Sequence, residues 1–272
     1  MATCVVGLGA AVSDAQQGET LSFEVASVKA NRSGDRSSRF QLLPGGRFVA
    51  TNTTVRALLQ AAYRFDYLPF QLIGGPSWIE VERFDVEGRA GASASMADVD
   101  AMVRSLLASR FKMTYVKETR DMPVYHLVAA RADGRPGPQL RQASKACDRT
   151  PIPVDAPPPA PNANALPRCG ARFTRGTLGQ RIEGIGATID ELAQRLSGPA
   201  LRIVVNRSNF EGTFDYELEF TPDNTQPATD AAADTSLALF TALQEQLGLR
   251  LESARGPVDV LVIQSAERPG EN

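Results

Sequence analysis

The 272-residue sequence has very little histidine and cysteine, with one histidine, His126, and three cysteines. Zinc sites draw on several histidine or cysteine ligands at short spacings, and neither a Cys-x-x-Cys nor a His-Glu-x-x-His pattern is present. A serine-type triad places a base beside its nucleophile, and no Gly-x-Ser-x-Gly motif occurs. The sequence therefore predicts no catalytic residue, no metal site and no cofactor. His126 lies in an alternating run, residues 124–128, and is interpreted as an ordinary strand histidine.

The sequence also lacks an excess of basic charge and a long apolar run. Its net charge is −2, whereas nucleic-acid-binding domains usually carry a basic face. No apolar run approaches the ~20 residues of a membrane-spanning helix. With 43% hydrophobic residues, the chain can bury a normal core. We therefore expect no nucleic-acid partner, and no transmembrane segment after removal of a signal.

Residues 1–20 resemble a secretory signal peptide. Residues 3–12 are small and apolar, and Ser13 and Ala15 stand where small residues precede a cleavage site. The usual basic start is missing, and a disordered tail is the alternative interpretation. The signal interpretation predicts an exported protein of the periplasm or the extracellular space.

The cysteine count fits export. If Cys4 leaves with the signal, Cys147 and Cys169 remain as a pair. A disulfide between them would close a loop of moderate length and stabilise the fold by roughly 3 kcal/mol through the entropy of the unfolded chain. Such a bond is typical of an oxidising compartment. The alternative is that the two thiols are unrelated.

Two stretches of alternating residues organise the sequence. Residues 213–220 place aromatic and aliphatic side chains on one side and carboxylates on the other, a period of two that predicts a half-buried strand. Residues 83–87 repeat this signature, and a helix pattern precedes and follows each copy. We therefore expect an α+β fold of two tandem similar units, each a mostly antiparallel sheet packed by two helices.

The expected boundaries are 21–130 for the first α/β unit, 131–179 for a linker and 180–272 for the second unit. Seven of the 18 prolines fall between Pro151 and Pro167, which excludes regular structure there. The cysteine pair brackets this Pro-rich linker. A second low-complexity insert occupies residues 223–235.

Capping boxes mark two of the expected helix starts, at Ser95 with Asp98 and at Thr188 with Glu191. Gly248 supplies a C-cap for a later helix. Each unit is expected to close with two separate strands. The other expected elements include an opening strand at 21–28, strands at 39–43, 47–51 and 84–89, helices at 54–63 and 236–247, and closing strands at 112–117, 124–129, 249–253 and 258–265.

The aromatic-rich segment between the first helix and the next strand is the best candidate for a binding surface. Its candidate residues are Tyr63, Tyr67, Phe70 and Trp78. Aromatic side chains between glycine and proline can sit in loops and present stacking faces to a sugar or a partner segment. The alternative is that they close one end of the core.

Asp215, Glu217 and Glu219 share one face of the strand at 213–220. Paired carboxylates hydrolyse glycosides when they are held at a suitable separation. A solvated sheet face is the simpler interpretation, and Asp85 and Glu87 repeat the pattern in the first unit, which favours a structural role.

Several motifs together resemble one family: FEVASVK at residues 23–29, GGPSWI at 74–79, LLASRFK at 106–112 and LQEQLGL at 243–249, with Val262-Ile263 and Glu267-Arg268-Pro269 closing the chain. They are similar to the Solibacter-type family of uncharacterised proteins, a domain of unknown function expanded in soil Acidobacteria. The resemblance covers nearly the whole chain after the signal. It implies an exported protein, joined in some relatives to a membrane-bound antirepressor-type metallopeptidase, and implies no activity.

The sequence departs from this family at one turn. Residues 206–210 read Asn-Arg-Ser-Asn-Phe where the family has Asp-Lys-Thr-Gly-Leu, so nothing that depends on charge there carries over. Each copy also resembles, more distantly, the short N-terminal domains of secretins and TonB-dependent receptors. That resemblance implies protein contacts in the periplasm.

The leading functional hypothesis is an exported, non-enzymatic module that binds an envelope protein or a small ligand. The alternative is a carboxylate-based hydrolase acting on polysaccharide, and a third possibility is a structural part of an envelope assembly.

Export and the disulfide predict one mass spectrum. The exported protein should lack about the first 15 residues, and alkylation should label two thiols only after reduction. Intact-mass measurement with and without reductant checks both expectations. An uncleaved chain with three freely alkylated thiols would contradict export.

Overall fold

The computed structural model describes most of the chain. The signal-like segment 1–20 and the insert 223–235 lie outside the described residues. The described ranges are 21–35, 37–63, 66–91, 94–144, 146–150, 165–176, 179–221 and 239–270.

Contacts divide the chain into two compact units that are not consecutive in sequence. Unit 1 comprises residues 1–62, 80–112 and 267–272, and unit 2 comprises residues 63–79 and 113–266. This division differs from the expected boundaries at 130 and 180. The difference arises because the segments 63–79 and 113–130 both pair with strands from the second half of the chain, as described below.

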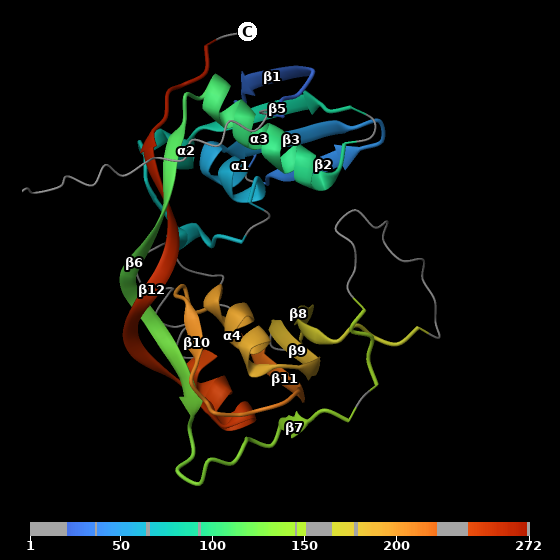
Figure 1. Cartoon of the computed structure of the whole chain (residues 1–272), viewed down its shortest axis with the longest axis vertical. Coiled ribbons are helices and arrows are strands. Elements are labelled where there is room, and N and C mark those ends of the chain that lie inside the picture. Colours follow the sequence, from blue (N-terminus) through green and yellow to red (C-terminus); the bar gives the residue numbers. More distant parts are fainter. Residues whose placement is uncertain are drawn as a thin grey trace, which may run out of the picture. The chain divides into compact units, whose positions relative to one another are not determined.

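Unit 1 is one antiparallel sheet with the strand order β1-β5-β3-β2. Helices α1 and α3 pack beside each other and bury their apolar sides (Figure 1). The expected capping box of Ser95 and Asp98 is confirmed at the start of α3. The elements of this unit are β1 (Val25–Ala30), β2 (Arg39–Leu43), β3 (Arg47–Thr54), α1 (Val55–Ala61), β5 (Arg83–Arg89) and α3 (Met96–Arg110), with α2 (Trp78–Val81) at the border of the two units.

The core of unit 1 follows the predicted periodicities. Val55, Leu58 and Leu59 of α1 are fully buried, as the apolar face expected from residues 54–63 requires. Phe84 of β5 and Phe111 after α3 meet edge to face, with ring centroids 5.3 Å apart, a favoured aromatic geometry.

Unit 2 contains two sheets, with the strand orders β7-β11-β9-β8 and β10-β6-β12-β4. Among the described residues, the three sheets of the protein are mostly antiparallel, and together with the helices they make an α+β fold, as expected. The elements of unit 2 are η1 (Pro69–Gln71), β4 (Leu72–Gly74), β6 (Thr114–Ala129), β7 (Leu140–Gln142), β8 (Gly170–Arg175), β9 (Gln180–Ala187), α4 (Ile189–Ser197), β10 (Val204–Asn206), β11 (Phe214–Phe220), η2 (Leu243–Leu247) and β12 (Leu249–Ser265).

The main core of unit 2 lies between the sheet β7-β11-β9-β8 and its helices. Phe214, Leu218 and Phe220 of β11 are buried against Leu192 and Leu196 of α4 in one hydrophobic cluster. The capping box of Thr188 and Glu191 begins α4. The expected C-cap is confirmed at Gly248, which follows η2 with a φ of +67°. These local signals were readable because each follows from a short sequence pattern.

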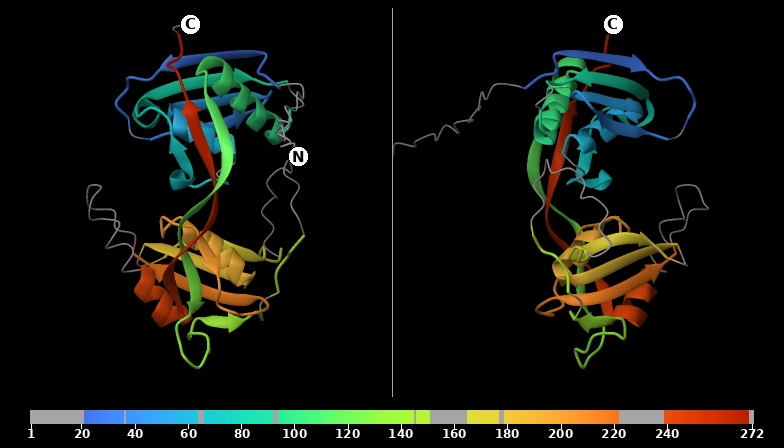
Figure 2. Two further views of the ribbon diagram at one scale, coloured as in Figure 1. Left: turned by 60° about the vertical axis from the view of Figure 1, so that its left-hand side comes forward. Right: turned by 90° about the vertical axis from the view of Figure 1, so that its right-hand side faces the viewer.

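The pairing of β6 with β12 is the main departure from expectation. The two strands run antiparallel along their whole lengths and wind about each other (Figure 2). The separate strands expected at 112–117 and 124–129, and at 249–253 and 258–265, are therefore each one continuous strand. The ribbon contains Pro123 in β6 and Pro257 in β12. Each strand has a second neighbour over only three residues, and neither proline is among those residues. The missing N–H of each proline is therefore tolerated, because that edge of the strand is open.

Two short parallel strands complete the ribbon sheet. β10 pairs with β6, and β4 pairs with β12. Each long strand thus takes a short neighbour from the other half of the sequence. The expectation of two self-contained tandem units, each with its own sheet, is not confirmed.

The sheets of the two units share one irregularity. The register of β3 with β5 shifts between Ala50 and Thr53, and that of β9 with β11 shifts between Phe214 and Tyr216. At each shift a residue adopts a left-handed backbone, Asn52 with φ +53° and Gly186 with φ +53°. Glycine and asparagine tolerate this conformation best.

An aspartate carboxylate holds each of these bulges, half-buried at Asp85 and buried at Asp215. The N–H of Asn52 donates to Asp85 Oδ1 at 2.8 Å, and the N–H of Gly186 donates to Asp215 Oδ1 at 2.8 Å. Asp215 Oδ2 also accepts the backbone N–H of Ser144 at 2.9 Å. Asp215 is only 8% exposed. It is therefore not part of the solvated carboxylate face expected for β11, although its spacing from Glu217 and Glu219 in the sequence suggested that it was.

Cys147 and Cys169 form a disulfide, with their Cα atoms 5.0 Å apart. The N–H of Cys169 donates to the carbonyl of Asp148 at 3.0 Å, and Arg168 pairs with Asp148 at 2.6 Å. The bond therefore closes an ordered base for the Pro-rich segment, whose residues 151–164 lie outside the described part.

The linker expected at 131–179 is not wholly a connection. It contributes β7 and β8, which form the two edges of the sheet β7-β11-β9-β8. β7 has only three residues and β8 lacks strong alternation, so neither has a clear strand pattern in the sequence. Both are strands because they pair with the central strands β11 and β9. Within the described residues, no helix is long and apolar enough to cross a membrane.

The carboxylate of Asp215 should be a large contributor to stability. Replacing Asp215 with alanine leaves two backbone N–H groups without their acceptor, and each such loss costs about 1–3 kcal/mol. We expect Asp215→Ala to lower the free energy of unfolding by about 2–4 kcal/mol, measured by urea denaturation. Glu217→Ala, at an exposed residue of the same strand, is the control and should change the free energy of unfolding by less than about 0.5 kcal/mol. Equal effects of the two substitutions would contradict this account of the bulge.

Candidate functional site

Two of the four predicted aromatic residues meet in a cluster within unit 2. The rings of Tyr63 and Tyr67 pack edge to face at 5.5 Å, and Tyr63 makes the same contact with Tyr115 of β6 at 6.0 Å. The Tyr63 hydroxyl also donates to the Tyr115 hydroxyl at 3.1 Å. Tyr63, Tyr67 and Tyr115, which we call the tyrosine cluster, are all half-buried.

Charged and polar groups surround the tyrosine cluster. The Lys117 ammonium lies 5.0 Å from the Tyr63 ring centroid, a cation–π distance. Burial, together with the nearby Tyr63 and Asp259, raises the pKa of the Tyr67 hydroxyl. The Asp259 carboxylate accepts a hydrogen bond from the Thr119 hydroxyl at 2.7 Å. The cluster thus combines aromatic surface with one cation, one carboxylate and several hydroxyl groups.

The segment that carries Tyr67 is fixed to the ribbon. The Gln71 side-chain amide donates to the backbone carbonyl of Asp259 at 2.8 Å and accepts the N–H of Leu68 at 2.9 Å. Strand β4 follows directly and pairs with β12. The segment is therefore held by hydrogen bonds within itself and to β12. These bonds give its aromatic side chains a defined position.

The other two predicted residues lie in neighbouring elements. Phe70 is in η1 and Trp78 begins α2, and both are half-buried. The ring of Tyr63 instead packs against Tyr115, which the sequence alone did not single out. Its position opposite Ile263 on β12 depends on a pairing of distant strands that no local pattern contains.

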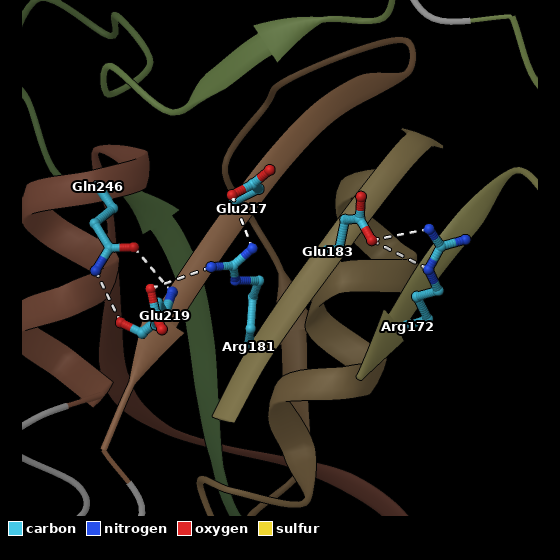
Figure 3. A network of polar contacts seen from close by, with 6 residues as sticks. All are labelled: Arg172, Arg181, Glu183, Glu217, Glu219 and Gln246. Carbon is cyan, nitrogen blue, oxygen red and sulfur yellow. Dashed lines mark hydrogen bonds and ion pairs between the residues drawn. The ribbon is translucent and has the colours of Figure 1, made fainter. Parts of the chain in front are cut away.

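The carboxylates considered for hydrolysis lie in a network of ion pairs. Arg181 contacts Glu217 at 3.4 Å and Glu219 at 3.5 Å, and Arg172 contacts Glu183 at 2.8 Å (Figure 3). Gln246 binds both backbone groups of Glu219, at 2.9 and 2.8 Å. Asp215 is buried at the bulge. Each carboxylate of β11 therefore has a structural partner, an arrangement typical of a charged sheet surface.

A polar cleft of about 310 Å³ lies beside these carboxylates and is lined by Gln139, Arg141, Ser144, Asp215, Tyr216 and Glu217. The Arg141 side chain donates to the Pro138 carbonyl at 3.3 Å. Burial raises the pKa of the Tyr216 hydroxyl well above its usual value. Tyr216 remains a neutral core residue over the physiological pH range.

His126 lies in the middle of the ribbon sheet, opposite Glu252 on β12 and Val205 on β10. It is half-buried. Within the described residues, no group of three histidine, cysteine, aspartate or glutamate side chains is arranged to hold a metal ion.

Comparison with known proteins identifies a family but no characterised relative. The family described as "Protein of unknown function (DUF3738)" matches residues 56–266. No curated protein and no solved structure matches the chain. The match agrees with the expected domain of unknown function, while the Solibacter-type assignment and the resemblance to secretin and TonB-receptor domains remain predictions. Because the matched residues make up well over half of the sequence, the chain belongs to the DUF3738 family of proteins of unknown function.

Proposed function

We propose that this protein is an exported, non-enzymatic module that binds an envelope protein or a small ligand through the tyrosine cluster. The observation that carries the proposal is the packing of Tyr63, Tyr67 and Tyr115 into one half-buried group, with Lys117 over the Tyr63 ring. Tyrosine is enriched among the residues that dominate binding energy at protein interfaces.

The geometry of the cluster supports recognition rather than simple core closure. Rings that lock one another lose little conformational entropy when a partner binds, because their rotamers are already fixed. The tyrosine hydroxyl groups, the Lys117 ammonium and the Asp259 carboxylate add directional contacts to the apolar ring surface. A closed core would bury these rings fully, as it buries Phe84 and Phe111 in unit 1.

Export is supported by the disulfide of Cys147 and Cys169. Disulfides persist in oxidising compartments and are rare in the cytosol. The periplasm or the extracellular space is therefore the proposed location, in agreement with the signal-like residues 1–20.

We also infer that the two halves of the chain are diverged copies of one unit. The order β1-β5-β3-β2 repeats as β7-β11-β9-β8. The bulges at Asn52 and Gly186, with their carboxylates Asp85 and Asp215, repeat the same hydrogen bond. The exchange of the short strands, β4 onto β12 and β10 onto β6, is equivalent in the two halves.

A photo-crosslinking amino acid in place of Tyr67 tests the binding proposal. In the envelope of cells that export the protein, irradiation should yield a discrete adduct at position 67, because this position lies on the proposed contact surface. The control is the same amino acid in place of Arg250, an exposed residue of β12 outside the cluster. Identical adducts at both positions, or none at position 67, would contradict the proposal.

The hydrolase alternative is tested by Glu217→Gln. This substitution keeps the shape of the side chain and removes the charge that faces Arg181. We expect the purified wild-type protein to release no reducing ends from bacterial or plant polysaccharides, and the variant to be indistinguishable from it. Turnover in the wild type that Glu217→Gln abolishes, with the fold intact by circular dichroism, would instead establish the hydrolase.

A further inference from the structure

A pocket on the sheet of unit 1 contains an unbalanced pair of arginines. Arg47 on β3 lies directly opposite Arg89 on β5. Side chains at such positions have Cβ atoms about 4.5–5.5 Å apart, and like charges there destabilise the sheet. The pocket has a volume of about 460 Å³, within the usual range for small-molecule sites. Its lining includes Val25, Ser27, Pro44, Arg47, Glu87 and Arg89.

Only one carboxylate in this lining offsets the two guanidinium groups. Glu87 contacts Arg47 at 3.0 Å, and both side chains are about half exposed, at 52% and 55%. In the part of the chain that the structure describes, no ion pair joins the Arg89 guanidinium to a carboxylate. The pocket therefore carries one uncompensated positive charge, on a planar group with several donors.

The corresponding position of the second sheet shows the balanced arrangement. Counted from the bulge, the pair that corresponds to Arg47 and Arg89 is Arg181 and Glu219. These opposite charges contact each other at 3.5 Å, as Figure 3 shows. The two sheets thus share their strand order and their bulge, but this pair is like-charged in the first sheet and oppositely charged in the second. The attraction between opposite charges on neighbouring strands explains why a glutamate stands at position 219. It does not explain why an arginine stands at position 89, opposite Arg47.

We propose that this pocket binds the carboxylate or phosphate group of a small anionic ligand between Arg47 and Arg89. Guanidinium groups bind both anions with paired, charge-assisted hydrogen bonds. The Ser27 side chain, opposite Glu87 on β1, supplies a further hydroxyl, and Val25 and Pro44 supply apolar surface for the body of the ligand. The anion offsets the repulsion between the two arginines, so the cost of placing them opposite each other is recovered on binding.

This site lies wholly in unit 1, whereas the tyrosine cluster lies wholly in unit 2. The anion site therefore does not rest on the function proposed for the cluster. The volume and the single uncompensated charge favour a ligand of monosaccharide size with one acidic group.

Isothermal titration of the full exported chain with three probes tests the proposal. The probes are D-glucuronate, inorganic phosphate and neutral D-glucose. We expect saturable binding of glucuronate, phosphate or both, and none of glucose. Binding should weaken as salt rises, because exposed charges are screened within about 10 Å at 0.1 M ionic strength. Binding of one anion alone would identify the acidic group that the pocket accepts.

Arg89→Glu is the decisive variant because it gives β5 the charge order found on β11. Anion affinity should fall by about tenfold or more. The matched control, Arg175→Glu on β8, makes the same change in net charge at an exposed position of unit 2 and should leave affinity unchanged. Absence of saturable anion binding by the wild type, or an equal loss in both variants, would overturn the proposal.

Thermal unfolding separates a binding role of Arg89 from a structural one. Relief of the repulsion with Arg47 should raise the Tm of the ligand-free Arg89→Glu variant by about 1–3 °C. If Arg89 serves binding and destabilises the fold, its replacement should both raise the Tm and lower the affinity for the anion. A lower Tm would assign Arg89 a structural role and overturn the proposal.

Discussion

The antiparallel pairing of β6 with β12 is the constraint on which the rest of the structure depends. It joins a strand from the middle of the chain to the strand near its end and leaves room on each for one short parallel neighbour. The ribbon positions the tyrosine cluster of unit 2, since Tyr115 and Lys117 belong to β6 and Asp259 to β12. The pairing also explains why the compact units are interleaved in sequence. β6 and β12 are the last strands of the two halves, and their long pairing with each other outweighs the tendency of each strand to stay in the sheet of its own half.

Much of the local structure could be predicted because it depends on short patterns. The alternation of residues 213–220 gave β11, and the capping boxes at Ser95 and Thr188 gave the starts of α3 and α4. The partners of the strands could not be predicted. Nothing in the alternation of β6 shows that it pairs with β12. The prolines at 123 and 257 resemble strand ends when only their sequence neighbours are considered.

The sites divide along the same line. Tyr63 and Tyr67 were visible as aromatic residues in a loop, and the disulfide followed from the cysteine count. Tyr115 was not visible, because its neighbours come from a register between strands far apart in sequence. Arg89 was also invisible: an arginine at the end of a strand is unremarkable until the register places Arg47 opposite it. The bulges illustrate the same limit, since Asp85 and Asp215 appeared as surface carboxylates until their backbone partners were known.

The ribbon has a consequence for the order of folding. The hydroxyl groups of Thr114 and Ser265 meet at 2.8 Å although 151 residues separate them in the chain. Contacts of such sequence separation form late, because a long loop must close before they provide any stabilisation. A chain that emerges from its N-terminus therefore exposes the edge of β6 until residues 249–265 have appeared. During that interval the strand is open to pairing with other chains, so dilution of the newly made protein favours the native pairing.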